Sequence, residues 1–160
     1  MSELQWKKVA VHDENNIKGF FGNFRFLSNF HVCAIEYEGL IYPSTENAYQ
    51  ASKVIPADRR MLTTCTPADS KKVWKMCRPL DKTPEEWDSR KLKVMTWVTL
   101  EKYNKHPELR QRLLDTGDRF IEETNWWRDK FWGVDINIGG ENNLGKLLMK
   151  VRTYWQIKAL

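Results

Sequence analysis

The sequence has few cysteines, and their spacing fits no common disulfide or zinc pattern. It contains three, an odd count with no CxxC pair: Cys33, Cys65 and Cys77. We therefore predict neither a disulfide framework nor a zinc site, and expect reduced, mostly buried thiols. The three histidines stand apart from one another and from the cysteines. A transition-metal site usually needs several such ligands together, so we expect no bound metal.

Long apolar runs, internal repeats and Gly/Ser-rich linkers are also absent. No uncharged apolar stretch approaches the ~20 residues that span a bilayer, and residues 1–10 lack the apolar core of a secretory signal. We therefore expect a cytoplasmic protein that does not bind membranes. The 160 residues are enough to bury a core. Without a visible boundary, we expect them to form a single domain.

The chain has only a small excess of positive charge: 26 basic and 21 acidic residues leave a net charge of +5. This charge suits an anionic ligand, either a phosphate ester or a nucleic acid, without choosing between them. We interpret the two clusters of basic residues as solvated helix faces: Arg59-Arg60, and Lys71, Lys72, Lys75 and Arg78. Eight Trp, five Tyr and seven Phe within a 41% hydrophobic chain exclude wholesale disorder.

Alternating apolar residues predict a strand over 32–37, a turn at Glu38-Gly39 and a returning strand over 40–42. We expect Pro43 to end that strand and Ser44 to cap a helix that runs to about Val54.

The rest of the chain is predicted to be mostly helical. Further helices are expected at about 58–65, 67–78, 84–104, 107–116 and 144–155, with a short strand over 119–123. Thr83 and Glu86 have the spacing of a capping box. Residues 125–142, with three tryptophans and three glycines, are expected to be irregular. The predicted class is α+β, a mostly helical domain with a small antiparallel sheet near the N-terminus.

Two segments in the first third of the chain carry more polar groups than packing requires. In residues 26–30, Ser28 and Asn29 lie between apolar anchors, although a capped turn that closes a loop is the alternative. In the second segment, one face of the predicted helix carries Glu46, Tyr49, Gln50 and Lys53. A carboxylate and an amine on one face can act as a base and an electrophile trap. The alternative is a surface face with weak mutual support.

A third segment, residues 126–135, is rich in aromatic and charged side chains. Its tryptophans can stack a nucleobase, and Arg128 can meet a phosphate. Asp129 or Asp135 can serve as a second carboxylate. The alternative is a tryptophan-rich plug that fills the core under a loop.

A fourth segment, residues 139–145, places glycines just ahead of the last predicted helix. Exposed backbone N–H groups at such a position favour anions. The pattern is neither GxGxxG nor a Walker loop, so it is weak by itself.

Taken in order, these segments resemble the NADAR family. The resemblance is carried by Phe-Leu-Ser-Asn-Phe at 26–30, Tyr-Pro-Ser-x-Glu at 42–46 with Gln50-Ala51-x-Lys53, Trp87, Asp129-x-Phe-Trp-Gly133, and Gly140-x-Asn142-x-Leu144-Gly145 with Leu148-Met149-x-x-Arg152. It covers about residues 20–155. No single motif is specific, but the set in this order is.

The resemblance implies an α+β fold, a site for ribosyl compounds and cleavage of an N-glycosidic bond. We expect no metal or cofactor in this reaction, because the leaving group requires only protonation. The implied substrates are phosphoribosylamino-pyrimidine intermediates of riboflavin synthesis, or ADP-ribose attached to guanine in nucleic acid. The implied catalytic residues are Glu46, Lys53 and Asp129. Residues implied or inferred to bind substrate are Ser28, Asn29, Tyr49, Trp87, Arg128, Trp132, Gly133, Asp135, Gly140 and Asn142.

Within this assignment, we expect Trp87 and Trp132 to stack the base, and Arg128 or the glycine loop near Asn142 to hold the phosphate. The chain departs from the family at Asn47, where His is common, and at Val134, where a carboxylate is common. Asp129 and Asp135 therefore both remain candidates for the second carboxylate. The competing hypothesis is a non-catalytic binder of ADP-ribose, NAD-type nucleotides or nucleic acid.

Overall fold

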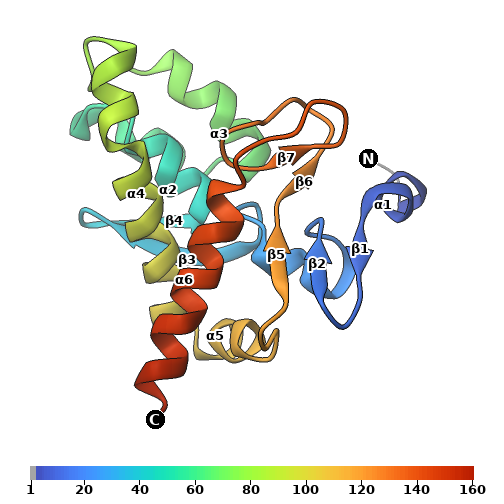
Figure 1. The fold of residues 1–160 in the computed structure, drawn as a ribbon. Helices are drawn as coiled ribbons and strands as arrows, with labels where there is room; N and C mark the ends of the chain where they lie inside the picture. Colours follow the sequence, from blue (N-terminus) through green and yellow to red (C-terminus); the bar gives the residue numbers. More distant parts are fainter. Residues whose placement is uncertain (1–2) are drawn as a thin grey trace. The chain divides into compact units, whose positions relative to one another are not determined.

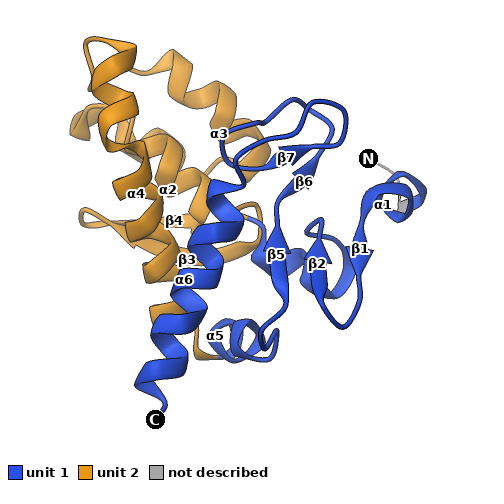
Figure 2. Cartoon of the chain, in the orientation of Figure 1, with its two compact units in different colours: residues 1–28, 108–160 blue, residues 29–107 orange. Residues whose placement is uncertain are grey.

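The computed structural model describes residues 3–160, which fall into two compact units (Figure 2). Unit 1 comprises residues 1–28 and 108–160, and unit 2 comprises residues 29–107. Each unit is described by itself, and the single domain stays a prediction. Within residues 3–160, no helix is long and apolar enough to cross a membrane.

Unit 2 begins with a β-hairpin of strands β3 (Val32–Tyr37) and β4 (Leu40–Ser44). Glu38 and Gly39 join the strands with positive φ angles of 44° and 83°, which is typical of a tight turn that matches the strand twist. The hairpin was predicted, but Pro43 does not end it. The register shifts between Val32 and Ile35, and proline is tolerated at such a bulge because the ladder there is already interrupted.

The hairpin leads directly into helix α2 (Thr45–Ala51), whose residues are all buried. The predicted cap is confirmed, because the Ser44 side chain accepts the Asn47 N–H at 3.0 Å. The prediction that the helix reaches Val54 is wrong. The Ser52 hydroxyl bonds to the Tyr49 carbonyl at 2.6 Å, and residues 52–53 form a turn. The N–H groups of Lys53 and Val54 bond to the carbonyls three residues back, each at 3.1 Å, so the last turn tightens and the helix ends before Lys53.

Two short helical segments follow in unit 2. The predicted helix over 58–65 is a 3₁₀-helix, η2 (Pro56–Leu62). The next begins as predicted with Thr66 as cap, but α3 (Pro67–Val73) gives way to the 3₁₀-helix η3 (Trp74–Met76). Arg59 does not lie on a solvated face. It is buried, donates to the Val54 carbonyl at 3.0 Å and pairs with Glu38.

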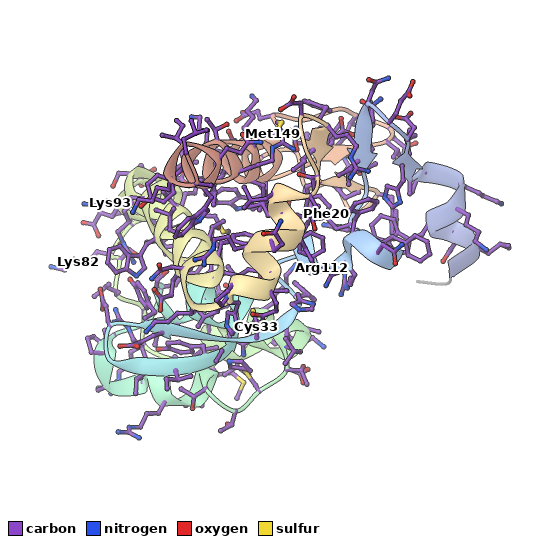
Figure 3. All side chains as sticks on the ribbon, turned by 90° about the horizontal axis from the view of Figure 1, so that it is seen from below. Phe20, Cys33, Lys82, Lys93, Arg112 and Met149 are labelled. Carbon is purple, nitrogen blue, oxygen red and sulfur yellow. The ribbon has the colours of Figure 1, made fainter. Side chains whose placement is uncertain are left out.

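Helix α4 (Pro84–Lys105) is the longest in the chain, as predicted. Thr83 accepts the Glu86 N–H at 3.2 Å, which is half of the expected capping box. The reciprocal bond is shifted by one residue, because the Glu86 carboxylate accepts the N–H of Lys82 at 2.6 Å. The buried face carries Val94, Met95 and Val98, whereas Lys93 points outward (Figure 3).

Unit 1 pairs segments from both ends of the chain (Figure 1). Strand β2 (Asn16–Lys18) is antiparallel to β1 (Val11–His12) and parallel to β5 (Phe120–Glu122). The other elements of unit 1 are α1 (Glu3–Val9), the 3₁₀-helix η1 (Gly22–Leu27), α5 (Pro107–Leu114), β6 (Thr124–Asn125), β7 (Val134–Asp135) and α6 (Asn143–Lys158). The first residue of α5, Pro107, belongs to unit 2, and the rest of that helix belongs to unit 1.

The core of unit 1 is built where α6 packs on β5. Ile17, Ile121 and Leu148 are each at most 1% exposed. The helices and small sheets of the two units confirm the α+β class. The sequence did not predict α1, β1 or β2, and the sheets are not purely antiparallel, because β2–β5 and β6–β7 are parallel pairs.

Candidate functional site

Helix α2 in unit 2 carries buried polar side chains that packing alone does not require. Glu46 is 6% exposed and Gln50 is 5% exposed. Gln50 Nε2 donates to Glu46 Oε1 at 2.7 Å, and the Glu46 backbone N–H donates to the Asn29 carbonyl at 3.0 Å. Burial of a carboxylate is costly without such partners. The bond from Gln50 therefore orients the carboxylate, and the backbone bond holds the residue that carries it.

Gln50 also carries an unsatisfied acceptor. Its Oε1 is buried and has no hydrogen-bond partner among the described residues. A buried acceptor of this kind usually has a bound water or ligand as its partner. The sequence placed Gln50 on the right face but assigned it no role, because spacing does not reveal an unpaired atom.

Asn47 holds α2 against the end of η2. Its side-chain amide donates to the carbonyls of Leu62 at 3.0 Å and Cys65 at 2.9 Å. Asn47 is fully buried. Its described contacts are structural, and they place Glu46 by anchoring the helix that carries it.

Lys53 lies just beyond α2, and its ammonium group is surrounded by aromatic rings. Nζ lies 5.2 Å from the Tyr49 ring centroid, 4.6 Å from Trp74 and 5.1 Å from Trp87. Burial lowers the pKa of Lys53 to about 8, which the charge of Glu46 partly opposes. A substantial fraction of this amine is therefore neutral near physiological pH. Trp74 was not a predicted site residue, because it comes from a different helix.

The position of Lys53 depends on the segment before α4. The Leu80 N–H donates to the Lys53 carbonyl at 2.8 Å, and Val54 forms a β-bridge with Pro79. Arg90 reaches back from α4 and donates to the Ser52 carbonyl at 2.6 Å. These contacts hold the turn after α2, and with it the Lys53 backbone.

Trp87 is half-buried and packs against Tyr49 edge to face, with ring centroids 5.2 Å apart. The Arg90 guanidinium lies 4.9 Å from the Trp87 ring centroid and donates two hydrogen bonds to the Asp81 carboxylate, at 2.8 and 2.6 Å. The Trp87 ring is thus one of the aromatic groups that surround the Lys53 ammonium group. The stacking of a base on its ring stays a prediction.

The loop of residues 125–142 in unit 1 contains both candidates for the second carboxylate, in different environments. Asp135 is 2% exposed, and its oxygens accept backbone N–H groups of Arg128, Asn137 and Ile138 at 2.8–3.2 Å. These bonds, led by the one from Asn137, lower the pKa of Asp135. Asp135 is therefore fully engaged in shaping the loop.

Asp129 is half-buried and less engaged than Asp135. Its Oδ1 accepts the N–H groups of Phe131 at 3.2 Å and Trp132 at 2.9 Å. Asn125 brackets its backbone with two further bonds, at 2.8 and 3.1 Å. Among the described residues, no hydrogen bond reaches Oδ2. Asp129 therefore keeps an oxygen that a ligand can use.

The glycines predicted to bind substrate lie against backbone. A Cβ on Gly133 would overlap the Glu123 carbonyl and lie 2.6 Å from Asn125 Nδ2, and one on Gly140 would overlap the Gly133 carbonyl. Asn142 uses both ends of its amide, accepting the Glu123 N–H at 3.0 Å and donating to the Ile121 carbonyl at 2.9 Å. These close contacts explain why glycine is needed at positions 133 and 140. Contacts between this motif and a substrate stay a prediction.

Most of the backbone N–H groups at the start of α6 are already bonded within the protein, and anion binding by this segment stays a prediction. The N–H groups of residues 141–144 donate to the carbonyls of residues 130–133, at 2.7–3.2 Å. A helix N-terminus attracts anions because its first N–H groups are unpaired. Here the tryptophan loop supplies their acceptors, so these N–H groups are not available to a phosphate.

We expect Gly133→Ala to destabilise the protein by ~2–4 kcal/mol, because the added methyl group must displace backbone. Thermal or urea unfolding measures this change. Ile138→Ala, at an exposed position of the same loop, is the control and should shift stability by less than ~0.5 kcal/mol. Equal stability of the Gly133→Ala variant and the wild type would contradict the packing described for this loop.

The remaining predicted binding residues are distributed over both units. In unit 1, Ser28 Oγ accepts a hydrogen bond from the Arg25 guanidinium at 3.4 Å. Arg128 is exposed and has a positive φ of 66°. The Trp132 ring packs edge to face on Phe131. In unit 2, Asn29 Nδ2 lies 3.4 Å from Met95 Sδ. Unit 2 thus brings together Asn29, Glu46, Tyr49, Lys53 and Trp87.

The three cysteines are free and half-buried rather than mostly buried. Within residues 3–160, no group of three or more His, Cys, Asp or Glu side chains could hold a metal ion.

This α+β fold is that of a known solved protein. The NMR structure of the Escherichia coli protein YbiA matches with a TM-score of 0.77 and 28% identity, covering 94% of this chain and 90% of that one. The NADAR domain family matches residues 11–155. The chain therefore belongs to the NADAR family, as the sequence motifs predicted.

Similar curated proteins carry names that describe an activity. An N-glycosidase of Nostoc punctiforme is 32% identical over 131 residues, 78% of this chain and 81% of that protein. The N-glycosidase YbiA of E. coli is 32% identical over 136 residues, 82% of this chain and 80% of that protein. These names support the predicted enzyme class, a hydrolase that acts on N-glycosyl bonds.

A riboflavin biosynthesis protein of Vibrio vulnificus is 33% identical over 132 residues, 81% of this chain. The chain spans only 35% of the length of that relative.

Proposed function

We propose that this protein is an N-glycosidase that hydrolyses the C–N bond between a ribosyl group and a base. The observation that carries the proposal is a buried carboxylate, Glu46, on the helix that leads to an amine of lowered pKa, Lys53, set among three aromatic rings. The names of the relatives support the same reaction. The proposed substrates are phosphoribosylamino-pyrimidines of riboflavin synthesis or ADP-ribosylated guanine.

Glu46 is proposed to act on the anomeric carbon. Cleavage of a ribosyl C–N bond develops positive charge at this carbon, which a fixed carboxylate stabilises. The same carboxylate can take a proton from the attacking water. Water supplies the oxygen at C1, and the departing nitrogen takes up a proton. The buried position of Glu46 strengthens its effect, because little solvent competes with it.

Lys53 offers a second route through a covalent intermediate. A ribosylamine opens to an imine, and the neutral Lys53 amine adds to C1 and expels the base as its free amine. Water then hydrolyses the lysine imine, which releases the ribose aldehyde and restores the amine. A lysine serves this chemistry when burial lowers its pKa.

Two further groups have proposed roles. Gln50 Oε1, which is unpaired among the described residues, would accept a hydrogen bond from the attacking water or a sugar hydroxyl. Asp129 is preferred over Asp135 as the second carboxylate, because Asp135 is occupied by backbone N–H groups.

An activity panel tests the proposed function. The protein is incubated with a ribosylaminopyrimidine phosphate and, separately, with DNA that carries ADP-ribosylated guanine, and released base or sugar is followed by liquid chromatography and mass spectrometry. We expect release from at least one substrate. Tight binding without release, with an affinity that falls steeply with salt, would instead identify a non-catalytic binder.

A further inference from the structure

Two exposed lysines of unit 2 flank one wall of the Lys53 environment. Lys71 of α3 and Lys75 of η3 lie four residues apart, and Trp74, which contacts Lys53, lies between them in the chain. Both side chains are exposed, and they belong to the segment that presents Trp74 to Lys53. Lys71 Nζ also lies 5.1 Å from the ring centroid of Phe30, beside the segment whose Asn29 carbonyl holds Glu46.

These two lysines have no acidic partner. Within residues 3–160, no ion pair is formed by either. Their charges nevertheless act on Lys53, as does that of Lys91, and all three oppose its protonation. Lys91 is already paired with Asp88 at 2.7 Å. Two uncompensated cations therefore lie within electrostatic reach of the buried amine.

We propose that Lys71 and Lys75 form the subsite that binds the phosphate group of the substrate. An ammonium group binds phosphate oxygens through charge-assisted hydrogen bonds, and an anion at this place would offset the repulsion among the lysines. The proposal rests on the proposed function and adds to it the requirement for a phosphorylated substrate.

The glycine segment before α6, one of the two phosphate sites suggested by the sequence, offers few free N–H groups. The N–H groups at the start of α6 are bonded to loop carbonyls. Lys71 and Lys75, by contrast, are exposed, and α3, which carries Lys71, is in contact with the Glu46-bearing helix. A phosphate ester and a pyrophosphate both present anionic oxygens, which accept hydrogen bonds from lysine ammonium groups.

Substitution of each lysine by glutamine tests the proposal. The ratio of kcat/KM for a ribosylaminopyrimidine phosphate to that for its dephosphorylated form should fall by about 10-fold in Lys71→Gln or Lys75→Gln, and further in the double variant. Lys72→Gln is the matched control, because it removes the same charge from the same helix. The main charges that act on Lys53 are those of Glu46, Lys71, Lys75 and Lys91, so Lys72 is expected to matter less. It should keep the wild-type ratio.

A binding measurement separates this proposal from the proposed function. Inorganic pyrophosphate is titrated into the wild type, the double variant and Lys72→Gln, with the heat of binding recorded. Binding that is lost only in the double variant supports the subsite even if no substrate is cleaved. A kcat/KM ratio that changes equally in all three single variants, or pyrophosphate binding that survives in the double variant, overturns it.

Discussion

Replacing Glu46 with glutamine is expected to lower kcat on a ribosyl N-glycoside by ~10²-fold or more, the usual scale for a positioned acid–base group. The fold should survive, because the new amide oxygen can still accept the Gln50 N–H that now bonds to Glu46 Oε1 at 2.7 Å. The substitution removes the negative charge and the base and turns one acceptor oxygen into an amide donor, so the stabilisation of the anomeric carbon is lost. Initial rates of base release measure the effect, with circular dichroism as the check on folding.

Glu85→Gln provides a matched control for this experiment. Glu46 and Glu85 both lie in the first turn of a helix, two residues after the capping residue. Loss of a favourable helix-dipole interaction is therefore common to both substitutions and costs roughly 0.3–1 kcal/mol. Glu85 is exposed, so its replacement should leave the rate unchanged. Wild-type turnover by Glu46→Gln would remove Glu46 from the mechanism.

Lys53→Arg is expected to lower kcat by ~10²–10⁴-fold if the covalent route operates. Arginine keeps the charge among the three rings, but it has no neutral amine to attack C1. Borohydride added during turnover should reduce the lysine imine of the wild type, and peptide mass spectrometry should locate a ribosyl adduct on Lys53. A wild-type enzyme that turns over without any adduct would contradict the covalent route and favour direct attack by water.

The same route predicts a pH dependence with a definite sign. Burial lowers the pKa of Lys53 to about 8, and only the neutral amine is nucleophilic. The wild-type rate should therefore rise as the pH increases from 6 and level off above about 8. A rate that stays flat through this range would show that deprotonation of Lys53 does not limit the reaction.

Local features were predictable because their causes are local. The turn at Glu38-Gly39 needs residues that accept positive φ, and the cap at Ser44 needs one short side chain at one position. Both are visible in a few residues, and the structure confirms both. The family motifs added the site residues of α2, since their identities and order are distinctive.

Contacts between distant segments could not be predicted in this way. The parallel pairing of Ile17 with Ile121 leaves no signal in either short strand alone. The Lys53 environment needs Trp74 from another helix, and its amine lies beyond the end of the helix that was expected to carry it. Arg59 appeared as a surface charge, although a carbonyl and a carboxylate hold it in the interior.

The proposed function depends on the carboxylate of Glu46, which we propose promotes cleavage of a ribosyl C–N bond. Native mass spectrometry of Glu46→Gln mixed with a ribosylaminopyrimidine phosphate tests it most directly, because one spectrum reports both binding and cleavage. We predict that the variant carries the mass of the intact substrate under conditions in which the wild type has released base and sugar phosphate. Free products formed by Glu46→Gln as fast as by the wild type would contradict the claim.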